Sequence, residues 1–271
     1  MYLNLLLIPF VTSLIFSIEG FKKYVWFMSI GYGLAVAGIG LALIVLALTG
    51  QVTVTAGFIV MAVLLVLYGI RLSGFLIYRE AKNATYRKTL ESVTTSIKSN
   101  SDMSFALKCL LWLSLSVLYV CECAPVFYRG VNPDNRYFWI LGAVISAFGI
   151  CFETAADLEK SAAKKKDPHS PAMTGLYRLV RCPNYLGELI FWTGIFVSGL
   201  TSNKGAGQWI LGSLGYILII FVMFSGAKRL EVRQNKNYGD SETYRHYADT
   251  TPILIPFVPL YHLVKEVKYG K

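Results

Sequence analysis

Seven long apolar segments constrain the fold of this chain more than any other feature of its sequence. They are 16 to 25 residues long and cover residues 2–18, 25–48, 54–78, 105–127, 137–152, 185–201 and 208–227. A helix needs roughly 20 apolar residues to cross a bilayer, so each segment is a candidate crossing. Charged residues make up only 15% of the chain, against about 25% in soluble domains, which excludes both a soluble enzyme and a disordered chain.

We therefore predict an all-α, polytopic membrane protein. A single membrane domain over residues 1–271 would hold a bundle of about seven transmembrane helices. In this prediction the fifth helix continues out of the membrane to residue 163, and residues 228–271 form a cytosolic tail.

Basic residues are divided unequally between the loops on the two sides of such a bundle. One set of loops, with the tail, holds 21 Lys and Arg residues, and the opposite set holds three, Arg129, Arg136 and Lys204. Cytoplasmic loops carry the excess of basic residues, so we expect the N-terminus outside and the C-terminus in the cytosol. The same charges would attract anionic lipid headgroups or converge on a phosphorylated ligand. They do not form a known nucleic-acid-binding module, so no nucleic-acid partner is expected.

Two familiar kinds of site are not indicated by the sequence. The five cysteines and three histidines lack the spacing of a metal site, so no metal is expected. Gly31, Gly33, Gly38 and Gly40 do not fit the dinucleotide-binding fingerprint, and close packing of helices explains them better.

Ionisable groups within the apolar segments are the first candidates for a site, because they are costly at membrane depth. Arg71 lies eight residues before Arg79, so roughly 12 Å inside the end of its helix. Tyr68 lies three residues earlier, on the same helix face. A packed core tyrosine is the competing interpretation of Tyr68.

A polar stripe follows the fifth apolar segment. Glu153, Asp157, Lys160 and Lys164 are spaced four, three and four residues apart, which places them on one helix face. Charge stripes of this kind are most often solvated faces with internal ion pairs.

The densest polar segment covers residues 174–188. Pro183 suits the first turn of a helix, after which Asn184 and Glu188 share one face at the mouth of the sixth apolar segment. Arg178 and Arg181 precede them, and Gly187 leaves room for close approach to the backbone. Packing alone explains this combination poorly, so we interpret it as a binding site.

These residues carry a resemblance to a known family. Gly175-Leu-Tyr-Arg178 and Arg181-Cys-Pro-Asn-Tyr-Leu-Gly-Glu188 resemble the signature of the steroid 5-alpha-reductase family and its bacterial membrane relatives of the DUF1295 type, whose usual form has His at the place of Cys182. Further blocks similar to that family are Tyr68–Leu72, Glu153–Asp157, Leu230–Arg233, Tyr238, Tyr244, Tyr247 and Leu254–Pro256.

The resemblance implies a membrane-embedded, NADPH-dependent reductase of a carbon–carbon double bond conjugated to a ketone, acting on a steroid-like or other lipid substrate. Tyr68 would be catalytic, donating a hydrogen bond to the substrate carbonyl. The residues implied to bind the cofactor are Arg79, Asp157, Lys164, Tyr177, Arg178, Arg181, Asn184, Tyr185, Glu188, Arg233 and Tyr247. The residues implied to line the substrate pocket are Trp26, Ser29, Arg71 and Glu122.

One departure from the family keeps two alternatives open. The family's steroid reductases place an acid shortly after a Trp-Phe pair to support the tyrosine, but Trp26 and Phe27 are followed by Met28, Ser29 and Ile30. Glu122 is a candidate replacement for the missing acid.

The first alternative function is a membrane methyltransferase like the isoprenylcysteine carboxyl methyltransferases, which use S-adenosylmethionine. Against it, this tail has Leu230-Glu231 in place of their paired glutamates. The second is a sterol-binding or lipid-binding membrane protein without catalysis.

Overall fold

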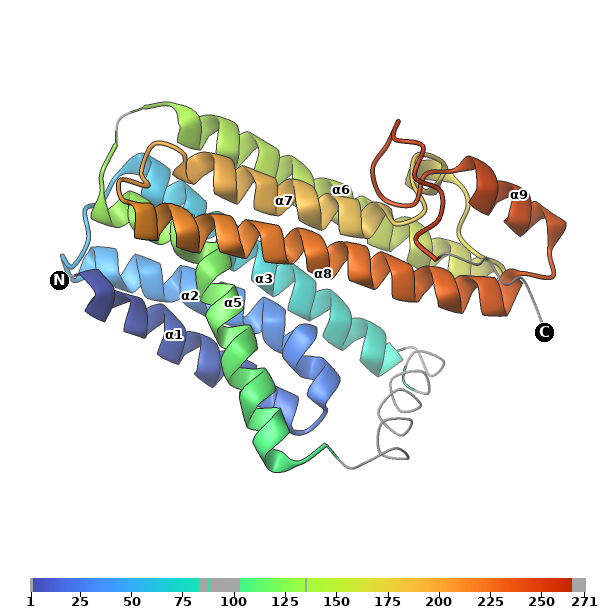
Figure 1. The fold of residues 1–271 in the computed structure, drawn as a ribbon, viewed down its shortest axis with the longest axis horizontal. Coiled ribbons are helices and arrows are strands. Elements are labelled where there is room, and N and C mark those ends of the chain that lie inside the picture. Colours follow the sequence, from blue (N-terminus) through green and yellow to red (C-terminus); the bar gives the residue numbers. More distant parts are fainter. Residues whose placement is uncertain (1, 83–86, 88–102, 135, 265–271) are drawn as a thin grey trace. The chain divides into compact units, whose positions relative to one another are not determined.

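A computed structural model describes residues 2–82, 87, 103–134 and 136–264 (Figure 1). The described residues form helices and no strand. The α-helices are α1 (Tyr2–Ser17), α2 (Ile30–Leu48), α3 (Ala56–Lys82), α5 (Phe105–Val131), α6 (Phe138–Lys166), α7 (Pro183–Gly199), α8 (Ala206–Tyr238) and α9 (Glu242–Thr250). Three short 3-10 helices are η1 (Ile18–Phe21), η2 (Tyr24–Met28) and η3 (Gly175–Arg178). The prediction of an all-α fold is confirmed.

Six of the described helical stretches are long and apolar enough to cross a membrane. The protein is therefore an integral membrane protein of the polytopic helical type. All seven predicted segments contain helix, but α7 has 17 residues and is shorter than the six candidate spans. This short helix accounts for the difference between six spans and the predicted seven.

Several helix ends differ from the predicted ends. The second predicted segment begins at residue 25, but residues 24–28 form η2 and α2 begins at Ile30, because Ser29 leaves the helical region with φ −136° and ψ −96°. At the other end of the chain α8 continues to Tyr238, so the predicted tail from residue 228 begins as helix. Hydropathy marks where lipid contact ends, whereas the backbone hydrogen bonds of a helix continue into polar sequence.

The chain divides into two compact units, which we describe separately. Unit 1 comprises residues 1–143 and 195–216, and unit 2 comprises residues 144–194 and 217–271. Part of the predicted basic loop, including Lys88 and Lys98, and the chain end from residue 265 lie outside the described residues.

Glycines on α2 allow close contact with two neighbouring helices in unit 1. A Cβ added to Gly38 would lie 2.7 Å from the Phe16 ring on α1, and one added to Gly40 would lie 2.8 Å from Val66 on α3. Ser73 of α3 donates a hydrogen bond to the carbonyl oxygen of Ile30 at 2.8 Å. These contacts confirm that small residues form a helix interface here.

Arg129 differs from its predicted place in an outer loop. Because α5 continues to Val131, Arg129 lies within the helix and is only 1% exposed. Its Nη1 donates to the carbonyl oxygen of Ser198, near the end of α7, at 2.5 Å. The guanidinium therefore satisfies a carbonyl at a helix end, which is a structural use of the charge.

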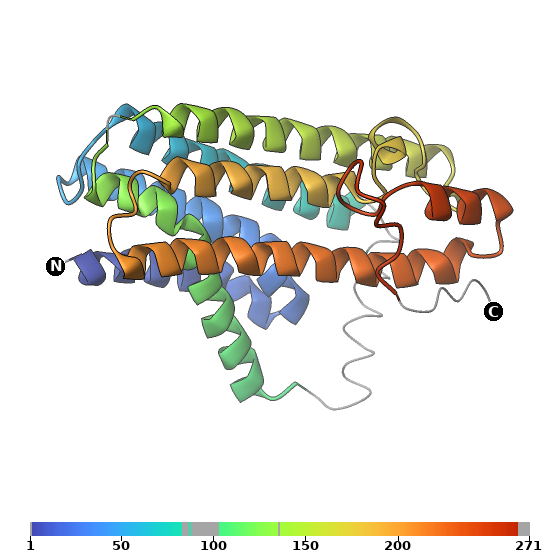
Figure 2. The ribbon, with the colours of Figure 1, turned by 45° about the horizontal axis from the view of Figure 1, so that its top comes forward.

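Unit 2 contains most of α6, the first part of α7, the second part of α8, and α9. Both views show α6, α7 and α8 of this unit side by side, with α9 close to the C-terminal end of α8 (Figures 1 and 2). Ser146 of α6 donates to the carbonyl oxygen of Phe191 on α7 at 3.0 Å. Gly187 of α7 packs on Glu153 of α6, since a Cβ added to it would lie 2.6 Å from the Glu153 Cβ.

Candidate functional site

The contact between Gly187 and Glu153 brings the polar stripe of α6 against the start of α7. Glu188 follows Gly187 on α7, and Asp157 lies one turn beyond Glu153 on α6. All three carboxylates are buried, with 3% exposure for Glu153 and 6% for Asp157 and Glu188. The acidic half of the stripe, Glu153 and Asp157, is therefore not a solvated face, contrary to the most common interpretation of such stripes.

Asn184 lies in the first turn of α7, directly after Pro183. Its side chain is half-buried, and its Oδ1 atom is buried without a hydrogen-bond partner among the described residues. Buried acceptors in native proteins nearly always have a donor. Asn184 therefore presents an acceptor that a bound ligand can satisfy.

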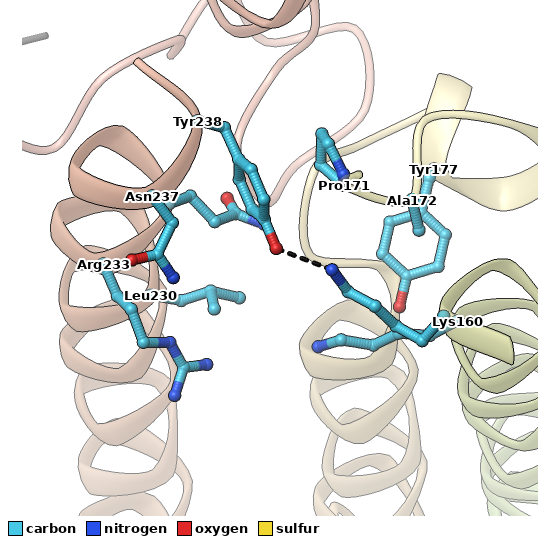
Figure 3. Close-up of a pocket in the computed structure, with 10 residues that line it drawn as sticks. Lys160, Pro171, Ala172, Tyr177, Leu230, Arg233, Asn237 and Tyr238 are labelled. Atoms are coloured by element: carbon cyan, nitrogen blue, oxygen red, sulfur yellow. Dashed lines mark hydrogen bonds between the residues drawn. The ribbon is translucent and has the colours of Figure 1, made fainter. Parts of the chain in front are cut away.

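A cavity of about 70 Å³ lies between the C-terminal parts of α6 and α8, beside η3 (Figure 3). Its lining residues come from these elements and the loop before η3: Lys160, Lys164, Pro171, Ala172, Tyr177, Leu230, Arg233, Gln234, Asn237 and Tyr238. We call it the basic pocket, because three of the ten residues are cationic and none is acidic. Such a lining attracts an anion.

Lys164 has a structural role at the edge of the basic pocket. Its Nζ donates to the carbonyl oxygens of Pro168 and Ser170 at 3.1 and 2.7 Å, and to the Tyr238 hydroxyl at 2.6 Å. An ammonium group has three donors, so these bonds use all of them. Lys160 and Arg233 supply the other positive charges of the lining.

Tyr177 and Tyr247 hold the loop that borders the basic pocket. The Tyr177 hydroxyl donates to the carbonyl oxygen of Ala156 at 3.3 Å, and the Tyr247 hydroxyl donates to the carbonyl oxygen of Tyr177 at 2.7 Å. Burial raises the pKa of both phenols, so they remain neutral donors at physiological pH. Gly175 opens η3 with a φ of +62°, facing Glu159, which accepts from the Leu176 amide.

The other predicted cofactor residues of unit 2 lie outside the pocket lining. Arg178 is exposed on η3, and Tyr185 packs against Gly226 of α8. Arg181 is 1% exposed and forms an ion pair with Glu231 at 2.8 Å. Arg79 belongs to unit 1, where its guanidinium lies 5.4 Å from the centre of the Phe75 ring.

Tyr68 lies in unit 1, within a group of buried tyrosines. It is fully buried, and its ring centre lies 6.3 Å from that of Tyr32 on α2. Tyr32 in turn lies 5.0 Å from Tyr119 on α5, whose hydroxyl donates to the carbonyl oxygen of Phe27 at 2.6 Å. Glu122 follows Tyr119 by three residues and is also buried. Sequence reasoning missed Tyr32 and Tyr119, although the spacing of Tyr119 from Glu122 was a usable signal.

The remaining predicted pocket residues of unit 1 have identifiable positions. The Trp26 indole donates to Glu80 at 3.0 Å, and Lys23 forms an ion pair with the same carboxylate at 2.5 Å. Ser29 donates to the carbonyl oxygen of Val25 at 2.9 Å, and Arg71 is half-buried. Trp26 and Ser29 thus have hydrogen-bond partners within the protein.

A sequence model of the family described as "Protein of unknown function (DUF1295)" matches residues 15–251. The chain belongs to the DUF1295 family. The match includes α6, η3, α7 and α8 in full, and so all the predicted cofactor residues of unit 2. None of the curated proteins and none of the solved structures matches the chain. Since the DUF1295 description names no activity, function has to be inferred from the chemistry of the site.

The structure contains no group of three or more His, Cys, Asp or Glu side chains placed to hold a metal, within the residues it describes.

Proposed function

We propose that this DUF1295 protein is a membrane-embedded, NADPH-dependent reductase of a carbon–carbon double bond conjugated to a ketone, in a steroid-like or other lipid substrate. The observation that carries the proposal is that unit 2 contains both the basic pocket and the polar start of α7 with Asn184 and Glu188, which we call the α7 mouth. A phosphorylated dinucleotide needs cations for its phosphates and polar partners for its uncharged groups. Unit 2 offers both.

The size of the basic pocket indicates which part of a ligand it would hold. At about 70 Å³ it is far smaller than the roughly 300–1,000 Å³ of a typical ligand pocket, so it would hold only a part of a dinucleotide, such as a phosphate group. Lys160 and Arg233 would pair with that phosphate, because ion-assisted hydrogen bonds to phosphate oxygens are among the strongest in proteins. Asn184, with its buried and unsatisfied acceptor, would bind an N–H or O–H group of the cofactor.

Tyr68 would act on the substrate. Reduced nicotinamide supplies a hydride, and addition of hydride to a conjugated enone places negative charge on the ketone oxygen. A donor fixed in a low-dielectric interior stabilises that charge strongly, and Tyr68 is fully buried. The neighbouring rings of Tyr32 and Tyr119 would hold the phenol in place.

The methyltransferase alternative is less consistent with unit 2. S-adenosylmethionine carries a positive sulfonium, which a pocket lined by three cations and no acid would repel. Glu231, at the place of that family's paired glutamates, is bound to Arg181 and to the backbone amides of Leu263 and Val264. A non-catalytic lipid-binding protein would have no evident need for buried carboxylates at the α7 mouth.

The proposal is tested by the small molecule that gently solubilised protein retains, identified by native mass spectrometry. We expect a nicotinamide dinucleotide phosphate. Arg233→Ala should weaken binding of added NADPH at least about tenfold, as for loss of a phosphate contact. Lys236→Ala is the matched control, since Lys236 is exposed on the same helix outside the pocket lining. Retention of an S-adenosylmethionine derivative, with no affinity for NADPH, would reject the reductase.

A further inference from the structure

The segment of residues 252–264, which we call the C-terminal strap, is hydrogen-bonded to the residues just before α7. The amide of Arg181 donates to the carbonyl oxygen of Pro252 at 2.8 Å, and that of Cys182 donates to Ile253 at 3.0 Å. The strap folds back on itself, since the amide of Ile253 donates to the carbonyl oxygen of Leu260 at 2.9 Å. It therefore fixes the backbone that leads into Asn184 and Glu188.

Glu231 of α8 fastens the far end of the strap. It is fully buried, and its Oε2 accepts from the amides of Leu263 and Val264 at 2.8 and 3.2 Å. Its Oε1 accepts from Nη2 of Arg181 at 2.8 Å, and the same nitrogen also donates to the carbonyl oxygen of Tyr261. One carboxylate thus joins α8, the strap and the entry to α7.

His262 adds a second connection from the strap. Its Nδ1 lies 2.9 Å from Oε1 of Glu231, and its Nε2 lies 3.0 Å from Oδ1 of Asp249 on α9. Ionised carboxylates only accept hydrogen bonds, so both contacts are satisfied only when both ring nitrogens carry a proton. Among the described residues, the ring pairs with Glu231 and Asp249, and Glu231 also pairs with Arg181.

We propose that Glu231 is a positioning residue for the α7 mouth, acting through the C-terminal strap, and that His262 tightens the strap through its contacts with Glu231 and Asp249. The strap and its contacts with Glu231 lie within unit 2. The binding of a ligand at the α7 mouth rests on the proposed function. Release of the strap would free residues 181–188 and loosen the grip of Asn184 and Glu188 on that ligand.

Cys182 reports on release of the strap, because it is 1% exposed and hydrogen-bonded to Ile253. In the purified full-length protein, Glu231→Gln should raise the alkylation rate of Cys182 at least about tenfold, since a neutral amide cannot replace the buried carboxylate. Cys121 and Cys123, buried in unit 1, should stay protected and so show that the protein remains folded. Glu242→Gln, an exposed acid on α9, is the matched control. An unchanged Cys182 rate in Glu231→Gln would overturn the proposal.

His262→Gln is the milder variant and decides the case if Glu231→Gln unfolds and exposes all three cysteines. The ratio of its Cys182 alkylation rate to that of the wild type, measured at one pH, cancels the intrinsic reactivity of the thiol. We expect this ratio to be at least about 10, because the variant loses the imidazole that bridges Glu231 and Asp249. A ratio of unity would contradict the role of His262 in the strap.

NADPH affinity separates this inference from the proposed function. Glu231→Gln should weaken NADPH binding about fivefold or more, with partial recovery in Glu231→Asp. If the variant opens the strap but binds NADPH as the wild type does, Glu231 is not a positioning residue. If the wild type itself binds no NADPH, the proposed cofactor is wrong, and the cysteine results still decide whether the strap exists.

Discussion

Individual side chains at the α7 mouth carry the proposed cofactor chemistry. Glu188 is buried beside the packed pair Gly187 and Glu153, one helical turn after Asn184, so it lies where we propose that the cofactor binds. Glu188→Ala should therefore weaken NADPH binding at least about 100-fold, while Asp240→Ala, at an exposed acid of the same unit, should leave it unchanged. Titration of purified protein with NADPH measures both, and equal affinities would remove Glu188 from the site.

Tyr68 is the residue proposed to act on the substrate. Tyr68→Phe should lower turnover about 100-fold or more, as for loss of a donor to a developing oxyanion, with NADPH still bound. Tyr78→Phe removes a phenol from the same helix at a side chain that is 64% exposed, and should retain full turnover. Turnover in Tyr68→Phe equal to that of the control would show that Tyr68 is a packed core residue.

Cys182 stands where the resembling family usually has histidine. Burial raises the pKa of its thiol to about 12, although Lys160 and Arg181 favour the thiolate. Only about 10⁻⁴ of the thiol is ionised at pH 8, against about one quarter for an ordinary thiol, and the thiolate is the reactive form. Alkylation of Cys182 should therefore keep rising about tenfold per pH unit up to pH 10, as measured by mass spectrometry of its peptide. A plateau near pH 9 would contradict the raised pKa.

The sequence located the polar residues of unit 2 but not all of their partners. Asp157, Asn184 and Glu188 could be grouped because helical spacing alone places them on helix faces. Lys164 and Arg181 were predicted to bind the cofactor, yet their hydrogen bonds go to Pro168, Ser170, Tyr238, Glu231 and Tyr261. Those partners depend on how distant segments fold back, which spacing along one helix does not reveal.

At the scale of elements, the α6–α7 contact depends on the absence of a side chain at Gly187. A Cβ added at residue 187 would lie 2.6 Å from the Cβ of Glu153, so one of the two helices would have to shift. Gly187→Ala should lower the free energy of unfolding by about 1–3 kcal/mol, the usual cost of overpacking, and lower Tm in detergent.

Gly207 of α8 provides the control for this prediction. A Cβ there meets no atom within 4 Å, so Gly207→Ala should not destabilise the protein and should gain helix propensity. A Tm for Gly187→Ala that matches the Tm of Gly207→Ala would mean that the α6–α7 contact is looser than described.

Helix cores were easier to predict than helix ends. Apolar composition located helix within all seven predicted segments, and six of the described helices are long and apolar enough to cross a membrane. It did not predict the break at Ser29 or the extension of α8 to Tyr238, which depend on local dihedral angles and on polar contacts such as that of Tyr238 with Lys164. The extension matters, because it carries Glu231 and Arg233.

At the scale of the whole molecule, the orientation in the membrane remains a prediction from charge. The loops predicted to be cytosolic hold 21 basic residues against three on the other side. A reporter fused to the C-terminus should therefore respond as cytosolic, and one fused to the N-terminus as external. The reverse pattern, or the same side for both ends, would contradict the predicted topology.

The polytopic class of the whole molecule followed from composition, but its internal division did not. Nothing in the hydropathy pattern indicates that α6, α7 and α8 each contribute to both compact units. Helix length and apolarity specify that a segment crosses lipid, whereas packing partners depend on shape, such as the glycine contacts of α2.

Transfer of hydrogen from cofactor to substrate tests the central claim most directly. Purified protein in lipid is incubated with a conjugated lipid ketone and with NADPH that carries deuterium at its transferable position. The reductase predicts a saturated ketone that contains one deuterium, formed about 100-fold or more faster by the wild type than by Tyr68→Phe. An unchanged enone with unoxidised NADPH, together with transfer of a labelled methyl group from S-adenosylmethionine to a lipid or peptide acceptor, would contradict it.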